Sequence, residues 1–273
     1  MGRTFNRQWH KISILSQDRN KSSRITALAK AAIKLDKAVL ASGIEKVGGE
    51  SLLERITKCI KSSEHWPTFE DIKAAIESKN AAVHSNSVPD ADKCTQHLHT
   101  FYNAWLALRS RFVTQENAAS LAREFFETGI FSDIFLFGSL ARGKNDSSDI
   151  DLLLLDDGTY SFLSVDYLDL QTTIFEVLMN IPFKKNQKIL AAAQCGWLDC
   201  IILNDALIGV DQEYTDLVCI KQRDPNFFQS LASCLLHYDQ ISGSWIKDEK
   251  SSARFENIRL SSNFSRRRPY RFY

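Results

Sequence analysis

A glycine turn between two apolar segments constrains the fold of this chain more than any other feature. Residues 134–137 are apolar and β-prone, and Gly138 follows them, where it allows a sharp turn and a close backbone approach by a ligand. A second apolar run at 152–155 consists of four leucines and predicts a buried strand. Asp149 and Asp151 precede this run. Because side chains alternate between the faces of a strand, both carboxylates should project to the same side.

Two carboxylates beside a glycine turn suit a divalent cation and a triphosphate. Asp149 and Asp151 would hold Mg²⁺, and the turn would hold phosphate oxygens. We expect Ser139 to cap a short helix after the turn, so that backbone N–H groups face an anion. The alternative is an ordinary buried strand with an exposed aspartate pair that caps a loop. We favour the cation site, because a buried strand rarely carries two carboxylates on one face without a partner.

The same residues carry a family resemblance. Gly138-Ser139, nine further residues and Asp149-x-Asp151 resemble the signature of the polymerase-β-like nucleotidyltransferases. The sequence Gly-Ser-Leu-Ala-Arg-Gly, followed by Ser-Asp-Ile-Asp-Leu, is most similar to the motif of the minimal nucleotidyltransferases, the MNT family. The resemblance extends over about residues 115–242. It implies magnesium-dependent transfer of a nucleoside monophosphate from a nucleoside triphosphate, with ATP as the expected donor, to an acceptor hydroxyl.

The resemblance also implies roles for individual residues. Asp149 and Asp151 would bridge two magnesium ions, one of them shared with a third acid. We expect that acid to be Asp199, inside the strand predicted at 196–204, where it would also serve as general base. The alternative for Asp199 is an edge-strand position that faces water. The residues implied to hold the nucleotide are Gly138, Ser139 and Arg142.

Upstream of the signature, apolar residues recur at helical spacing. The clearest stripe runs from Cys94 to Phe112 in alternating steps of four and three residues, and it requires partner helices. Ser51 and Thr68 are expected helix N-caps. The predicted fold class is α+β: an N-terminal all-α helical bundle, then a polymerase-β-like nucleotidyltransferase α/β domain with a small mixed sheet.

Changes in composition along the chain predict its division into segments. The basic residues of the C-terminal end alternate with aromatic ones, which suits nucleic-acid binding or an acidic partner, although we favour a solvated tail. Beyond the signature, helices are predicted at 165–179, 186–193 and 226–238. The expected segments are a flexible N-terminus at 1–23, a helical bundle at 24–113, a nucleotidyltransferase domain at 114–245 and a basic, aromatic tail at 246–273.

One segment of the bundle resembles a second family. Lys79 and His84, five residues apart, are similar to the Arg-polar-x-x-x-His motif of HEPN domains, which are small helical bundles often paired with MNT domains. In HEPN ribonucleases the Arg and His act on RNA phosphate at a dimer interface, so the resemblance allows a homo-oligomer. Lys79 stands where that motif has Arg, and Lys is a point charge rather than a bidentate fork. The alternative is a His at a helix end, where its charge suits the dipole. The other histidines, including His97 and His99, are expected to be solvated or without ligand partners.

Composition indicates which partners and which cellular compartment to expect for this chain. The formal net charge is +1, so bulk electrostatics do not indicate a nucleic-acid binder. The six cysteines are scattered and form no Cys-x-x-Cys pair, which predicts reduced thiols and a cytoplasmic location. We expect no signal peptide and no membrane span.

Three functions fit these observations. The first is nucleotidyl transfer to a hydroxyl of a protein or an RNA, which we favour over a small-molecule acceptor. The second is a fused HEPN/MNT protein of toxin–antitoxin type with a regulated ribonuclease. The third is a nucleotide-binding regulatory module without catalysis, against which the intact Asp149, Asp151 and Asp199 argue.

Overall fold

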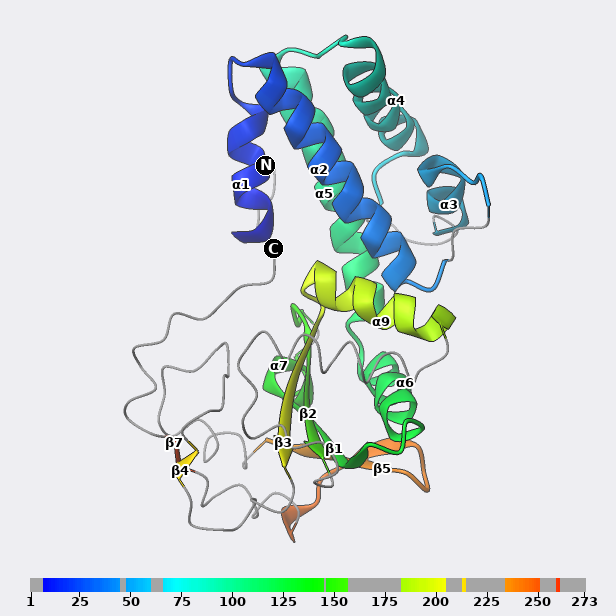
Figure 1. Ribbon diagram of the computed structural model, residues 1–273, viewed down its shortest axis with the longest axis vertical. Coiled ribbons are helices and arrows are strands. Elements are labelled where there is room, and N and C mark those ends of the chain that lie inside the picture. Colours follow the sequence, from blue (N-terminus) through cyan, green and yellow to red (C-terminus); the bar gives the residue numbers. More distant parts are fainter. Residues whose placement is uncertain are drawn as a thin grey trace. The chain divides into compact units, whose positions relative to one another are not determined.

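The structure is a computed structural model that divides into two compact units, Met1–Phe112 and Val113–Tyr273 (Figure 1). This division lies one residue from the domain joint expected after residue 113. The residues that the structure describes are 7–44, 48–59, 66–144, 146–156, 183–204, 213–214, 234–250 and 259–260. The fold is mixed α+β, with a helical first unit and a small mixed sheet in the second.

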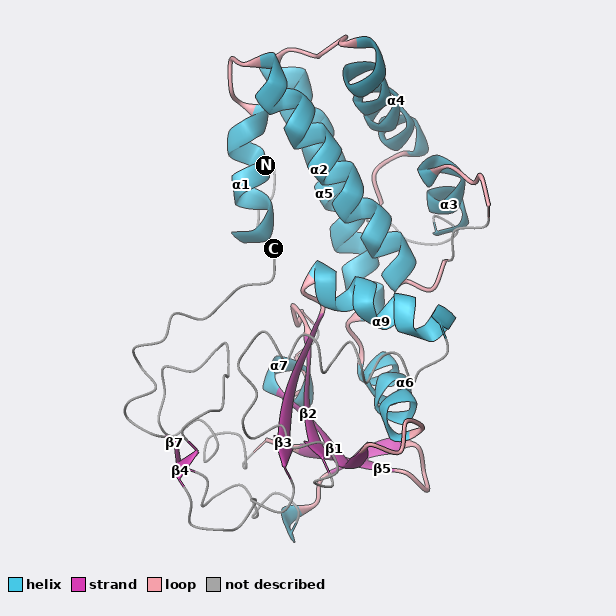
Figure 2. Ribbon diagram, in the orientation of Figure 1, coloured by secondary structure: helices cyan, strands magenta, loops and turns pink. Residues whose placement is uncertain are grey.

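The described part of the first unit consists of helices and their connecting loops (Figure 2). The long helix α5 packs against α2, α1 and α4, and the short helix α3 contacts α2 and α4. The predicted stripe on α5 is buried, including Leu98 and Phe101. The helix bounds are α1 Arg7–Ser16, α2 Lys21–Ala41, α3 Leu52–Cys59, α4 Phe69–Ser85 and α5 Ala91–Phe112.

The expectation of a flexible segment over residues 1–23 is wrong from residue 7 onwards. Helix α1 is packed on the bundle, and its Trp9 is fully buried. The indole ring of Trp9 lies 5.3 Å from the ring of Tyr102 and 6.0 Å from that of Trp105, measured between centroids. A large aromatic side chain buries enough apolar area to dock a short polar helix. The polar composition of this segment therefore does not prevent its docking.

Helices α2, α3 and α4 begin at residues whose side chains cap the first turn by hydrogen bonds. The amide of Ser51 donates to Glu54 Oε2 (2.6 Å) and the amide of Glu54 donates to Ser51 Oγ (3.3 Å), which confirms the capping box before α3. Thr68 Oγ1 accepts from the amide of Asp71 at the start of α4, as expected. Helix α2 begins earlier than its apolar stripe indicates, because Asn20 caps it.

Arg24 joins three chain segments at one end of the bundle. Its side chain is 9 % exposed, and Nε donates to the carbonyl of Pro89 at 3.0 Å. Nη1 donates to the carbonyls of Asp18 (2.7 Å) and Arg19 (2.9 Å). A buried guanidinium with three carbonyl partners holds the α1–α2 loop and the loop before α5 against α2.

Replacing Arg24 should destabilise the first unit. We expect Arg24→Met to lower the free energy of unfolding by about 2–3 kcal/mol. The substitution removes three hydrogen bonds from a charged group and leaves the three accepting carbonyls without their donor. Urea unfolding of the purified protein measures this. Arg19→Met is the matched control, since Arg19 is exposed and contributes its carbonyl rather than its side chain, and it should change stability by less than about 0.5 kcal/mol. Equal effects of the two variants would contradict the role of Arg24.

His97 is buried rather than solvated, so that expectation is wrong. It is 5 % exposed on α5, and burial lowers the pKa of its imidazole, with a further lowering by the charge of Lys93 and a smaller, opposite effect of Asp71. His97 precedes the buried Leu98, and α5 packs against α1, α2 and α4. These several neighbours bury a wider surface of α5 than its apolar stripe predicts.

The buried imidazole should make stability depend on pH. Since its pKa is lowered in the folded state from the ordinary value of 6.5, the unfolded chain binds more protons, and the free energy of unfolding should fall as the pH drops below about 6.5. His97→Gln should flatten this fall in urea titrations between pH 8 and pH 5. The measurement at pH 8, where the ring is neutral in both states, gives the baseline effect of the substitution. Parallel pH profiles of the two proteins would contradict the prediction.

The second unit is built on a five-stranded mixed sheet with the strand order β3-β2-β1-β5-β6. Strands β2 and β3 are parallel, whereas β1 pairs antiparallel with both β2 and β5, and β5 with β6. Helix α6 packs against β1 and helix α9 against β3. A separate parallel pair joins β4 (Glu213–Tyr214) to β7 (Arg259–Leu260). The other bounds are α6 Gln115–Phe126, β1 Phe131–Phe137, α7 Gly138–Ala141, β2 Ile150–Asp156, α9 Phe183–Cys195, β3 Leu198–Asn204, β5 Leu236–Asp239 and β6 Ser244–Ile246.

The predicted apolar strands form the centre of this sheet. Residues 134–137 lie in β1 and residues 152–155 in β2, and each of these side chains is at most 3 % exposed. Strand β2 lies between β1 and β3, so it has no solvent edge for pairing. A central strand covered on both faces requires continuous apolar residues instead of alternation, which explains the four leucines.

Downstream predictions have mixed outcomes. The helix expected at 186–193 is confirmed by α9. The helix expected at 226–238 is wrong at its end, because 236–239 form strand β5, and its earlier part lies outside the described residues. Short apolar runs fit helix and strand periods alike, and pairing with Phe135 and Leu136 of β1 decides for a strand. The helix expected at 165–179 and most of the tail from 246 also lie outside the described residues.

Among the helices that the structure describes, none combines the length and the apolarity needed to cross a membrane.

Candidate metal and nucleotide site

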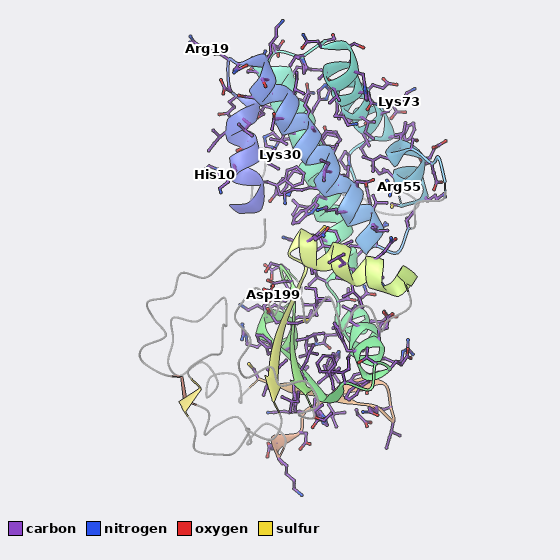
Figure 3. All side chains as sticks on the ribbon, viewed as in Figure 1. His10, Arg19, Lys30, Arg55, Lys73 and Asp199 are labelled. Atoms are coloured by element: carbon purple, nitrogen blue, oxygen red, sulfur yellow. The ribbon has the colours of Figure 1, made fainter. Side chains whose placement is uncertain are left out.

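Three aspartates that are far apart in the sequence meet at one edge of the sheet. Asp149, Asp151 and Asp199 each offer a carboxylate oxygen, and these oxygens lie within 4.8 Å of one another. Asp151 is 4 % exposed, and the other two are half-buried. Figure 3 labels Asp199 near the start of β3. The structure therefore brings together the three acids that the sequence predicted as one group.

Strand register explains this meeting. The amide of Ile150 donates to the carbonyl of Trp197 at 2.8 Å, where β2 and β3 begin to pair. In the parallel ladder that follows, Asp151 lies opposite Asp199. Paired residues of neighbouring strands project from the same face. Asp149 precedes Asp151 by two residues, so it extends the group along the same side.

The backbone of Gly138 packs directly against the carboxylate of Asp151. Its φ angle is +76°, in a region that L-residues with side chains rarely adopt. A Cβ placed on Gly138 would lie 2.0 Å from Oδ2 of Asp151 and 2.9 Å from its Cγ, distances that are too short for any real contact. The turn and the carboxylate are therefore in direct contact, and only glycine fits between β1 and this acid.

The predicted role of Ser139 as a helix cap is wrong. The N-cap of α7 is Phe137, which makes no side-chain capping bond, and Ser139 lies inside this four-residue helix. The last residue of β1, Phe137, occupies the capping position, because α7 begins directly after the strand. The carbonyl of Ser139 accepts from the amide of Lys144 at 3.1 Å and closes the turn after α7. Arg142 is exposed, and its Nη1 lies 3.8 Å from the sulfur of Cys234.

The donor set of the acid cluster consists of oxygens. Cys200 follows Asp199 on β3. Because neighbouring residues of a strand project to opposite faces, its thiol does not share the face that carries Asp199. Carboxylate oxygens without soft ligands suit Mg²⁺ and Mn²⁺. Three convergent acids would repel one another without a cation between them, and the three carboxylates fit a magnesium site.

The structure does not bring Lys79 and His84 together on α4. At about 100° per residue, five residues separate two side chains by about 140° around the helix axis. Nζ of Lys79 donates to Oδ1 of Asn80 at 2.8 Å, whereas His84 is exposed in the last turn of the helix. Within a single copy of the chain, these two residues do not converge on one phosphate.

A histidine–carboxylate cluster elsewhere in the sheet has no signal in the sequence. His237 Nε2 lies 2.6 Å from Oδ1 of Asp133, and its Nδ1 lies 3.8 Å from Oδ2 of Asp248. The imidazole also stacks on Phe135 at 5.0 Å between centroids. His237 and Asp133 are 104 residues apart and meet only because β5 pairs with β1. The cluster links these two strands and contains none of the three aspartates.

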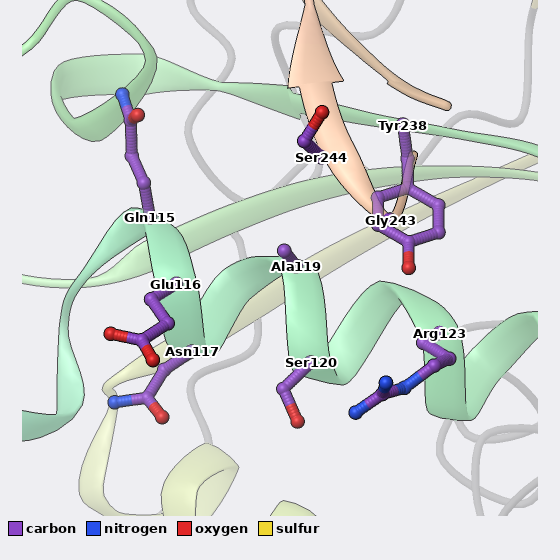
Figure 4. Close-up of a pocket in the computed structure, with 9 residues that line it drawn as sticks. All are labelled: Gln115, Glu116, Asn117, Ala119, Ser120, Arg123, Tyr238, Gly243 and Ser244. Atoms are coloured by element: carbon purple, nitrogen blue, oxygen red, sulfur yellow. The ribbon is translucent and has the colours of Figure 1, made fainter. Parts of the chain in front are cut away.

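A polar hollow of about 440 Å³ lies between α6 and the β5–β6 hairpin (Figure 4). Its lining includes the charged side chains of Glu116 and Arg123, with Tyr238 on the side of the hairpin. None of the three clustered aspartates contributes to this lining. The acid cluster, rather than the hollow, is therefore the candidate functional site.

Comparison with known proteins identifies no relative. No protein-family model, no curated protein and no solved structure matches the chain.

Proposed function

We propose that this chain is a magnesium-dependent nucleotidyltransferase of the MNT type. It would move a nucleoside monophosphate from a nucleoside triphosphate, with ATP as the expected donor, to a hydroxyl of a protein or an RNA. The observation that carries the proposal is the cluster of Asp149, Asp151 and Asp199 against the Gly138 turn. Three convergent carboxylates against a glycine turn suit the metal ions that accompany the phosphates of a nucleotide better than they suit a structural role.

The acids would hold the metal. Asp149 and Asp151 would bind two magnesium ions, and Asp199 would share one of them. When bound, the ions supply charge neutralisation for the triphosphate and lower the pKa of the acceptor hydroxyl.

The remaining steps belong to side chains and backbone of the chain. Asp199 would accept the proton of the acceptor hydroxyl, whose oxygen forms a bond to the α-phosphorus while the bond to the β-phosphoryl oxygen breaks and pyrophosphate leaves. The Gly138 turn would hold the terminal phosphates through its backbone, with the Ser139 hydroxyl as a further donor. The exposed guanidinium of Arg142 would neutralise phosphate charge.

The described geometry favours none of the alternatives. A ribonuclease would need Lys79 and His84 to act on one phosphate, and within a single copy of the chain they diverge on α4, so this alternative requires a second copy. The intact Asp149, Asp151 and Asp199 argue against a module without catalysis, and transfer from labelled ATP separates the two. A small-molecule acceptor remains the alternative to a protein or an RNA, because the signature specifies the donor chemistry and acceptor choice depends on other surfaces.

Labelled ATP tests the proposed transfer. The purified protein is incubated with Mg²⁺ and α-labelled ATP, alone and with host lysate, and run on a denaturing gel. We expect label on a protein or RNA band, no label from γ-labelled ATP, and loss of label with Asp149→Asn. Retained labelling in that variant, or binding of magnesium–ATP without transfer to any band from any nucleotide, would contradict the proposal.

A further inference from the structure

The three aspartates differ in how the fold holds them. Asp151 lies inside β2, is nearly fully buried and rests on Gly138. Asp199 lies inside β3 and pairs in register with Asp151. Asp149 precedes β2, which begins at Ile150, and it is half-buried. Strand pairing therefore orients two of these carboxylates, and the orientation of Asp149 depends on other contacts.

Ser148 supplies such a contact. Its Oγ lies 2.7 Å from Oδ1 of Asp149. An ionised carboxylate has no proton to donate, so the hydroxyl donates and the carboxylate accepts. This distance is typical of a hydroxyl–oxygen hydrogen bond.

The segment that carries Ser148 is itself held in place. Ser147 is 7 % exposed, and its hydroxyl donates to the carbonyl of Lys144 at 2.8 Å. The amide of Lys144 donates to the carbonyl of Ser139. Gln115 reaches across from α6, and its Nε2 donates to the carbonyl of Leu140 at 3.0 Å. These hydrogen bonds tie Ser147, the neighbour of Ser148, to Lys144, and tie Lys144 and Leu140 to Ser139 and α6.

We propose that Ser148 is a positioning residue that orients the Asp149 carboxylate for a divalent cation. This inference rests on the proposed function, because it assigns Asp149 to the metal. Groups that hydrogen-bond to metal ligands set the geometry of those ligands and reduce the ordering required when the ion binds. Removing such a partner typically costs about 10–100-fold in metal affinity. Ser148 is exposed, so its substitution should change metal binding without changing the stability of the metal-free protein.

Calorimetric titration of the full-length protein with Mn²⁺, in the absence of nucleotide, tests this inference. We expect Ser148→Ala to bind Mn²⁺ about tenfold more weakly than the wild type. Ser148→Thr keeps the hydroxyl and should restore the affinity. Ser132→Ala is the matched control, because Ser132 bonds to the carbonyl of Leu155 far from the acids, and it should leave Mn²⁺ binding unchanged. In the transfer assay, Ser148→Ala should raise the Mg²⁺ concentration for half-maximal rate by a similar factor, with little change at saturating Mg²⁺.

Three results would overturn the assignment: Mn²⁺ affinity of Ser148→Ala equal to that of the wild type, a Ser148→Thr variant as weak as Ser148→Ala, or a loss of stability on urea unfolding that accounts for the weaker binding. Failure of the proposed function is distinguishable from these. If the wild type transfers nucleotide and Ser148→Ala keeps its metal affinity, only the role of Ser148 fails. If Asp151→Asn keeps full transfer activity, the proposed function itself fails.

Discussion

Asp151→Asn should abolish nucleotidyl transfer and leave the fold intact. Asp151 is the most buried of the three clustered acids; it contacts the Gly138 turn, and its oxygen lies within 4.8 Å of those of the other two carboxylates. An amide keeps the shape of the side chain but loses the charge that would hold a metal ion. Metal-based charge stabilisation contributes several kcal/mol to a transition state, so we expect the rate to fall by at least about 10³-fold. The α-labelled ATP assay measures the loss.

Thermal unfolding separates this effect from misfolding. Three carboxylates with oxygens within 4.8 Å repel one another when no cation is present. Removing one charge should therefore leave the melting temperature of the metal-free protein unchanged or raise it, and should abolish the increase that Mg²⁺ produces in the wild type. Asp146→Asn is the matched control, since Asp146 is an exposed acid in the same loop, and it should keep both activity and the Mg²⁺ response. An Asp151→Asn protein with normal activity would refute the assigned site.

Gly138→Ala should combine a loss of stability with a loss of metal binding. The backbone conformation at φ +76° costs a residue with a side chain about 1–2 kcal/mol. The new Cβ would also overlap Oδ2 of Asp151, and overpacking of this kind costs about 1–3 kcal/mol more. Because the carboxylate must move away, we expect the Mg²⁺-induced rise in melting temperature and the transfer activity to disappear.

Gly143→Ala is a close control for this substitution. Gly143 has almost the same backbone angle, φ +74°, and apart from its chain neighbours no atom of the described residues lies within 4 Å of the position of its Cβ. The alanine there should cost only the backbone contribution of about 1–2 kcal/mol and keep Mg²⁺ binding. The difference between the two variants in urea unfolding isolates the contact with Asp151. Equal destabilisation with normal Mg²⁺ binding in both would show that the Gly138 turn does not support the carboxylate.

The sequence alone determined the central strands and the chemistry of the candidate site. The apolar composition of residues 134–137 and 152–155 is enough to predict that these strands are buried, because a strand covered on both faces can hold few polar residues. Asp149, Asp151 and Asp199 interrupt or flank such strands, where an acid needs a partner, and this made them recognisable before any contact was known. Capping by Ser51 and Thr68 is also local chemistry and is readable from neighbouring residues.

Only the tertiary structure decided which distant residues meet. The docking of α1 through Trp9, the strand conformation of 236–239, the burial of His97 and the pair of His237 with Asp133 all depend on partners tens of residues away. Such partners leave no trace in local spacing, because the free energy that selects them comes from area and hydrogen bonds supplied by another element. The site shows the same division: its acids are local features, whereas their 4.8 Å grouping follows from the parallel register of β2 and β3.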